Sequence, residues 1–211
     1  QDKPFISIES MISLLNKGNP VVIYINGTYN SVPSFNITAN TILRGSDVTR
    51  IKFAKGNLIS IQQSDFSAVN CSFEFTDTPE AITAVGGNVS LTNVELALEG
   101  SDTGIGLQAD TVNINLLNTG FTVKSKNYAS GFSLIDSNIV VDGSRVVVLS
   151  DTVVAFSIVD SIFDLQDSSI TVLGTLARCA EIVRSQITMG NSLFQAKKNN
   201  PSVSAIWVDK K

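Results

Sequence analysis

The chain has 211 residues, of which 43% are hydrophobic and 16% charged, a balance that excludes a disordered polymer and provides for a sizeable buried core. Fifteen basic and nineteen acidic residues give a net charge of −4 with no basic run, which argues against a nucleic-acid partner. The absence of histidine removes the commonest general base and metal ligand, two cysteines cannot build a disulfide framework, and no apolar run approaches the roughly 20 residues needed to span a bilayer.

The first predicted element is a short helix that begins after Ser7 and ends at Gly18. Serine is a favoured helix N-cap, and glycine is the usual residue beyond a helix C-terminus. The apolar positions follow the i, i+3, i+4, i+7 spacing of one helix face: Ile8, Met11, Ile12 and Leu15. We therefore expect residues 1–36 to hold an N-terminal helix cap and a first strand.

From there to the end of the chain, apolar pairs at i and i+2 recur in three columns, with a period of about 24 residues. The first column begins its pairs at Ile37, Ile59, Ile82, Ile105, Phe132, Phe156, Ala180 and Ser204. The second begins at Leu43, Phe66, Val89, Ile114, Ile139, Phe163 and Ile187. The third begins at Ile51, Phe73, Leu96, Phe121, Val146, Ile170 and Phe194. Each pair indicates a short strand with one buried face.

Three such strands per row, stacked row upon row, predict an all-β fold of about seven three-sided coils over residues 37–211. Each strand would lie beside its copy in the next coil, in the same direction, so the sheets would be parallel. A β-sandwich is the alternative. It would need longer strands joined by hairpins, and the Asn-Gly hairpin signal occurs only at 26–27.

A polar column follows the second apolar column by four residues, at Asp47, Asn70, Asn93, Asn118, Gly143, Asp167 and Asn191. These residue types tolerate a left-handed backbone and bond locally to their own chain. We interpret the column as an internal ladder at a sharp corner between two strands. The alternative interpretation is a polar binding row.

The chain now resembles the pectin lyase-like superfamily. The resemblance rests on the N-terminal helix, the strand 21–25, the turn 26–29, the strand 41–45 and the row 69–73. It implies a right-handed, single-stranded parallel β-helix with a capping helix, found in secreted or cell-surface proteins. The superfamily includes lyases, hydrolases, esterases, tailspikes and adhesins, so the resemblance implies a fold more than an activity. In its enzymes, the catalytic groove runs over the outer face of the first sheet.

The outward row predicted for that face carries one ionisable residue, since it consists of Thr38, Ser60, Thr83, Gly106, Ser133, Ser157, Glu181 and Ala205. Cleavage of sugars needs two carboxylates at a fixed separation, or carboxylates that hold Ca²⁺ beside a basic residue. The flanking loops are also short, the longest holding eight residues between Val123 and Phe132. We therefore expect a module without catalytic residues and without a cofactor.

Asp136, Asp160 and Arg184 are the candidates for catalysis if there is any, since each lies three residues before a second-column anchor. Stacked carboxylates about 4.8 Å apart would repel, which would raise the pKa of one of them. A turn ladder whose charges partly neutralise each other is the preferred interpretation.

Asp77, Glu80, Glu99 and Asp102 lie on two neighbouring loops, where oxygen ligands can hold Ca²⁺. None follows a ligand-loop motif, so a solvated acidic patch is the preferred interpretation. Tyr128 and Trp207 are candidates for stacking on sugars, and Trp207 alternatively covers the open end of the stack.

The sequence thus predicts a non-catalytic secreted or cell-surface β-helix module that acts as a rigid adhesion or scaffold domain and binds a glycan or another surface protein. One alternative is a polysaccharide lyase or glycoside hydrolase with a shallow groove on the first sheet. Another is an assembly module of a fibre or tailspike-like protein, in which further chain or a second copy covers the C-terminal coil. Neither nucleic acid nor a membrane span is expected.

Overall fold

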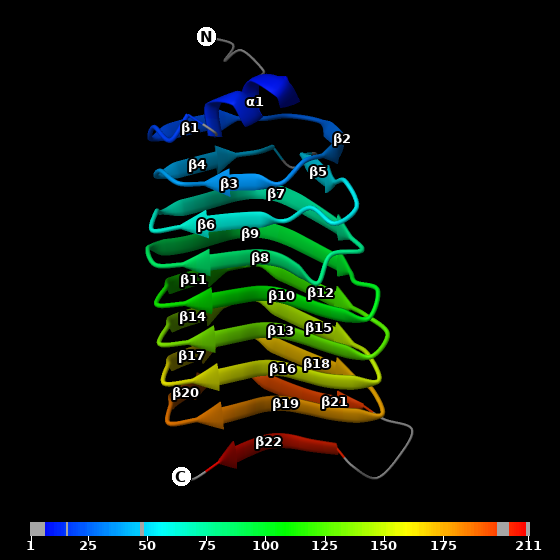
Figure 1. Ribbon diagram of the computed structural model, residues 1–211. Coiled ribbons are helices and arrows are strands. Elements are labelled where there is room, and N and C mark those ends of the chain that lie inside the picture. Colours follow the sequence, from blue (N-terminus) through cyan, green and yellow to red (C-terminus); the bar gives the residue numbers. More distant parts are fainter. Residues whose placement is uncertain (1–6, 16, 47–48, 198–202, 210–211) are drawn as a thin grey trace.

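The computed structural model describes residues 7–15, 17–46, 49–197 and 203–209, which form an all-β solenoid with a helix at its N-terminal end (Figure 1). The chain winds as a right-handed parallel coil of about seven turns. The predicted fold is confirmed: every strand pairing between coils is parallel, as direct stacking requires.

The first side of the coil is an eight-stranded sheet whose strands are stacked in chain order. Its strands are β3 (Phe35–Ile37), β6 (Ile59–Gln62), β8 (Glu80–Val85), β10 (Thr103–Asp110), β13 (Tyr128–Ile135), β16 (Thr152–Val159), β19 (Leu176–Val183) and β22 (Val203–Asp209). We call it the first sheet. It faces the viewer in Figure 1, with all of its arrows pointing the same way.

The second and third sides belong to one bent, 14-stranded sheet. The second side holds β1 (Val21–Tyr24), β4 (Thr41–Arg44), β11 (Asn113–Leu117), β14 (Asn138–Asp142), β17 (Ile162–Gln166) and β20 (Gln186–Gly190). The third side holds β2 (Thr28–Val32), β5 (Arg50–Phe53), β12 (Gly120–Lys124), β15 (Arg145–Leu149), β18 (Ser169–Leu173) and β21 (Leu193–Lys197). Two longer strands, β7 (Phe66–Thr76) and β9 (Asn88–Glu99), run around the corner and join the two sides.

The second and third apolar columns stack as predicted. Phe66, Val89 and Ile114 are partners in register on consecutive coils, and all three are buried. The second column differs in its first row, where Thr41 rather than Leu43 pairs with Phe66. The inward side chains of the second and third columns are buried between successive coils, and this burial supplies the hydrophobic stabilisation that a single coil lacks.

The prediction of the first apolar column is wrong in three rows. The strands place Phe35, Leu107 and Ile206 in register with the column, where the alternation had suggested Ile37, Ile105 and Ser204. In the first row the alternation is regular, and Phe35 rather than Ile37 begins the inward pair. In the Leu107 row the reason is that two consecutive residues, Gly106 and Leu107, are both buried. A side chain at the first of these positions would lie 2.7 Å from the Gly131 carbonyl oxygen, so only small residues fit there.

The N-terminal helix α1 (Ile8–Leu15) packs on β1 and β3 and closes the top of the stack in Figure 1. The Ser7 hydroxyl accepts a hydrogen bond from the Ser10 amide at 3.3 Å, so the predicted N-cap is confirmed. Met11 is fully buried against the first coil, and Gly18 has the left-handed backbone (φ 64°) expected just beyond the helix.

Two files of serine and threonine hydroxyls line the inside of the corners, a feature that the sequence analysis missed. At the corner between the first and second sides, the Ser137 amide donates to Ser161 Oγ at 2.9 Å, and the Ser161 amide donates to Ser185 Oγ at 3.0 Å. The same arrangement links Thr119, Ser144 and Ser168 at the next corner. These hydroxyls satisfy backbone amides that the turns would otherwise bury without a partner.

Candidate site: a polar groove along the amide corner

The corner between the second and third sides is built from residues in the left-handed conformation, as the sequence predicts. The φ angles at Asn70, Asn93, Asn118, Gly143, Asp167 and Asn191 all lie between 46° and 57°. Asp47 lies outside the described residues. Amide side chains bond from coil to coil here, with Asn93 Nδ2 donating to Asn70 Oδ1 at 3.1 Å and Asn118 Nδ2 to Asn93 Oδ1 at 3.4 Å.

The amide ladder is external, so its prediction as an internal ladder is wrong. Asn93 and Asn118 are exposed, and Asn70 is half-buried. The left-handed residue interrupts the alternation of the strand, so Leu117 and Asn118 both face outward and Thr119 takes the buried place behind them. The interior of the corner therefore belongs to the hydroxyl file, and the amides face solvent.

A groove of about 590 Å³ follows this outer corner over β5, β7 and β9. Its lining includes Arg50, Asn70, Ser72, Glu74, Asn93 and Glu95. A smaller hollow of about 160 Å³ shares Glu95 with it and extends along the same corner to Arg145. The larger volume lies in the range of small-molecule binding sites, and its polar lining differs from the usual apolar pocket.

Three of the charged side chains of the two hollows, Arg50, Glu95 and Arg145, stand in one outward row of the third side. Arg50, Ser72, Glu95, Gly120 and Arg145 follow one another in register from β5 to β15. Four strand steps separate the two arginines, or about 19 Å at the usual strand spacing. Among the described residues, no ion pair or side-chain hydrogen bond engages the two arginines or Glu95.

Glu74, on the other wall of the groove, is neutralised by Lys52, with the ammonium 2.9 Å from the carboxylate. The groove thus offers free hydrogen-bonding groups of both signs beside a row of amides. The amide column was considered from the sequence as a polar binding row, but the charged row beside it was missed. The sequence signal for this row is the residue directly before each third-column anchor, since Arg50, Glu95 and Arg145 are charged residues at that position.

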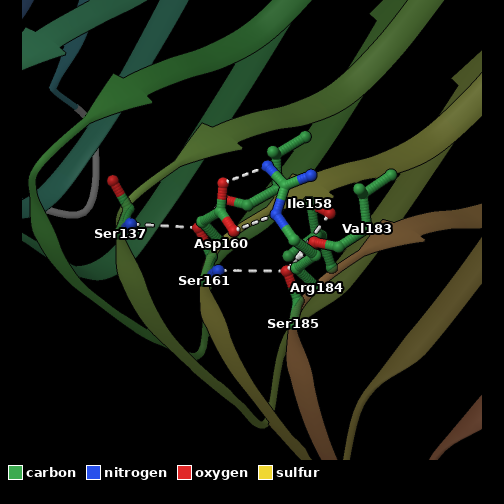
Figure 2. A network of polar contacts seen from close by, with 8 residues as sticks. Ser137, Ile158, Asp160, Ser161, Val183, Arg184 and Ser185 are labelled. Atoms are coloured by element: carbon green, nitrogen blue, oxygen red, sulfur yellow. Dashed lines mark hydrogen bonds and ion pairs between the residues drawn. The ribbon is translucent and has the colours of Figure 1, made fainter. Parts of the chain in front are cut away.

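Asp160 and Arg184 come together at the corner between the first and second sides (Figure 2). Asp136 occupies the equivalent position one coil earlier. Arg184 grips the Asp160 carboxylate with two hydrogen bonds, Nε to Oδ1 at 2.7 Å and Nη2 to Oδ2 at 2.5 Å. The hydrogen bond from Arg184 lowers the pKa of Asp160, so repulsion between stacked carboxylates does not raise it. Asp160 in turn raises the pKa of Arg184, and the charge of Asp136 adds to this.

All three residues adopt the left-handed backbone of a corner and are exposed. Figure 2 shows the ion pair beside the inner serine file of the same corner. This geometry matches the turn ladder that the sequence favoured for the three residues. An exposed carboxylate that accepts two hydrogen bonds from an arginine is a poor acid or base for catalysis, because its proton affinity is reduced and water surrounds it.

The outer face of the first sheet carries mainly hydroxyl residues. Thr83, Ser133 and Ser157 lie in this row as predicted. The strand register places Asn36 and Gln108 in the row, where the sequence had suggested Thr38 and Gly106. Tyr128 begins β13 and is half-buried; burial, and secondarily the charge of Glu181, raises the pKa of its phenol. Arg178 pairs with Glu181. The backbone of Trp207 pairs with Glu181 in register, and its side chain lies outside the described residues.

The four acidic loop residues do not converge. Asp77 pairs with Lys55 at 2.7 Å and Glu99 with Lys124 at 3.7 Å, while Asp102 accepts a hydrogen bond from Asn127 at 3.3 Å. Glu80 lies in β8 on the first sheet. In the described parts of the chain, no three potential ligands gather closely enough to hold a metal ion.

A second amide ladder runs along the corner between the first and second sides, and the sequence analysis missed it too. Asn88 Nδ2 donates to Asp65 Oδ1 at 2.6 Å, and Asn113 and Asn138 continue the file with bonds of 3.2 and 3.1 Å. The hollow beside it, of about 350 Å³, includes Val140. It contains no charged side chain among its described lining residues, so it offers fewer specific contacts than the groove.

Comparisons with protein families, with curated proteins and with solved structures give no significant match to this chain. The fold is therefore assigned from the geometry of the coils alone. Within the residues that can be described, the chain offers no helix with the length and apolar character to traverse a lipid bilayer.

Proposed function

We propose that this chain is a non-catalytic binding module, secreted or displayed at a cell surface, whose corner groove takes an extended glycan. The observation that carries the proposal is the polar groove itself, in which Arg50, Glu95 and Arg145, with no ion-pair partner among the described residues, stand beside the row of amides. Carboxylate, guanidinium and amide groups together donate to and accept from sugar hydroxyls. Its place among pectin lyase-like proteins is part of the proposal and rests on the sequence resemblance.

The repeat of the groove favours a linear polymer. Successive coils present equivalent side chains at the strand spacing of about 4.8 Å. A pyranose unit in an extended chain advances by a length close to that spacing, so one sugar can meet one coil. The rigidity of the stack supports this use, because groups held in place by two neighbouring coils lose little freedom on binding.

The lining argues against a protein partner for this groove. Stable protein interfaces have aromatic or aliphatic anchors at a desolvated centre. The described lining of the groove offers only Ala97 and the buried Cys71 as small apolar residues. A hydrated polymer suits such a surface better, because water can bridge the remaining polar atoms.

A glycan array probed with the intact chain tests the proposal. We expect selective binding that falls about tenfold in Arg50→Ala, as for the loss of one hydrogen bond to a charged group. Arg184→Ala is the matched control, since it removes an exposed arginine from the corner between the first and second sides, and it should bind as the parent does. Absence of binding to every glycan would refute the proposal.

The same glycans should be incubated with the chain and analysed for chain length. Turnover that disappears in Asp160→Ala would refute the non-catalytic part of the proposal and favour a lyase or hydrolase at the Asp160 corner. Unchanged glycans are the expected result, because Arg184 occupies both carboxylate oxygens of Asp160.

Assembly is a separate matter from the groove. Met189 and Leu193 on the last coils are about half exposed, as is Val140 on the second side. That further chain or a second copy covers this end stays a prediction, which light scattering across a range of concentrations can test.

A further inference from the structure

Two glycines open a gap in the corner groove. Gly143 stands where the neighbouring coils place Asn118 and Asp167 in the ladder. Gly120 stands between Glu95 and Arg145 in the charged row and is the register partner of both. The missing side chains leave the hollow of about 160 Å³ at this point.

Two oxygen acceptors lean into the space that the glycines leave. A Cβ atom on Gly143 would lie 2.5 Å from Asn118 Oδ1, and one on Gly120 would collide with the Glu95 carboxylate. The oxygens of Asn70 and Asn93 each accept an amide hydrogen bond from the next coil, whereas Asn118 Oδ1 accepts none from the described residues. The ladder therefore ends here with an open acceptor.

The charges of the gap select the ligand. Glu95 and Arg145 border the same hollow with opposite charges and without an ion pair between them. A small cation would meet the Arg145 charge, and a small anion would meet the Glu95 charge. A neutral group that both donates and accepts satisfies both sides, and the adjacent hydroxyls of a sugar ring are such a group.

We propose that this gap is the anchoring subsite of the groove and that it takes one neutral sugar residue through two adjacent hydroxyls. One hydroxyl donates to Asn118 Oδ1 or to the Glu95 carboxylate, and the other accepts from Arg145. This assignment rests on the proposed function and adds to it the chemical class of the sugar. The gap also fixes where along the corner a polymer begins to bind, because every other described coil of the ladder fills the position with Asn or Asp.

The test fills the gap, and because a Cβ atom on Gly143 would lie 2.5 Å from Asn118 Oδ1, the Asn118 side chain must rotate to make room for it. Gly143→Asn introduces the residue type that the neighbouring coils carry at the same left-handed position, and its amide would donate to Asn118 Oδ1. Gly86→Asn is the matched control, since Gly86 has a similar φ of 68° at the corner between the first and second sides, outside the groove. Glu95→Gln is a second variant that keeps the shape and removes the charge.

Binding of mannohexaose, cellohexaose and hexagalacturonate is measured by calorimetry for each folded variant. We expect the parent to bind a neutral hexasaccharide more tightly than hexagalacturonate. Gly143→Asn and Glu95→Gln should each weaken that binding about tenfold or more, while Gly86→Asn leaves it unchanged.

The outcomes separate the two proposals. If the parent binds a glycan and both groove variants bind it equally well, the subsite is refuted and the glycan-binding function stands. Preference for the acidic hexasaccharide also overturns the subsite. If the parent binds no glycan on the array or in solution, the proposed function fails and the subsite fails with it.

Discussion

Removal of one buried hydroxyl, by Ser161→Ala, tests whether the inner serine file supports the coil. Ser161 and its partner Ser137 are 4% and 1% exposed. The Ser161 hydroxyl accepts from the Ser137 amide at 2.9 Å and donates to the Val159 carbonyl at 2.7 Å. Replacement by alanine removes both bonds and very little volume.

The two lost bonds have unequal costs. The Val159 carbonyl keeps a partner, because it also accepts from the Asp136 amide at 3.1 Å. The Ser137 amide loses its acceptor and stays buried, which costs about 1–3 kcal/mol in the free energy of unfolding. With the usual dependence on urea, the unfolding midpoint should fall by on the order of 1 M.

Urea unfolding gives the global effect, and amide hydrogen exchange at Ser137 gives the local one. Ser157→Ala is the control, since Ser157 lies in the half-buried outward row of the first sheet and should unfold close to the parent. We expect faster exchange at Ser137 in Ser161→Ala and unchanged exchange at Ser144 in the other file. A variant that unfolds like Ser157→Ala, with Ser137 still protected, would contradict the role assigned to the hydroxyls.

Three further predictions follow from the core, the ion pair and the thiols. Phe156→Ala should lower the free energy of unfolding by about 3–5 kcal/mol, because the Phe156 ring is fully buried and stacks on Phe132 at 5.2 Å; a loss no larger than that of Ser157→Ala would contradict this packing. Arg184→Ala should raise the pKa of Asp160 toward its ordinary value, as measured from the chemical shift of its carboxyl carbon, and an unchanged titration would argue against the pair. Because the pKa of Asp160 is lowered in the folded state, the stabilisation by this pair is present at neutral pH and is lost as the pH falls through that lowered pKa. Cys71 and Cys179 should resist a thiol reagent at pH 8 until the chain unfolds, because burial raises the pKa of each thiol to about 11; rapid labelling of the native chain would disprove this.

The sequence was sufficient for the parts of the fold that depend on strict alternation. The Phe73, Leu96 and Phe121 file lies where the pattern put it, because β7, β9 and β12 alternate regularly through this stretch. The left-handed corner between the second and third sides was also predictable, since Asn, Asp or Gly marks the described positions whose φ is positive.

The first column could not be placed by alternation alone. In β10, two consecutive residues, Gly106 and Leu107, both face inward. A search for apolar residues at i and i+2 therefore chose the pair Ile105 and Leu107, whereas Leu107 is the residue in register with the column. The exposure of the amide ladder was missed for a related reason, because a left-handed residue shifts the alternation by one. The groove was missed because a single column does not show the register of Arg50, Glu95 and Arg145 across separate coils.

The most direct test of glycan binding in the corner groove is a ¹H–¹⁵N titration of the labelled chain with the tightest neutral glycan found. Asn93 and Asn118 line the two hollows of the groove, and their side-chain amides report on it without mutation. We predict that these signals shift together and saturate with the affinity measured by calorimetry. Shifts confined to Ser133 and Ser157, on the outer face of the first sheet, would place the site elsewhere and contradict the account.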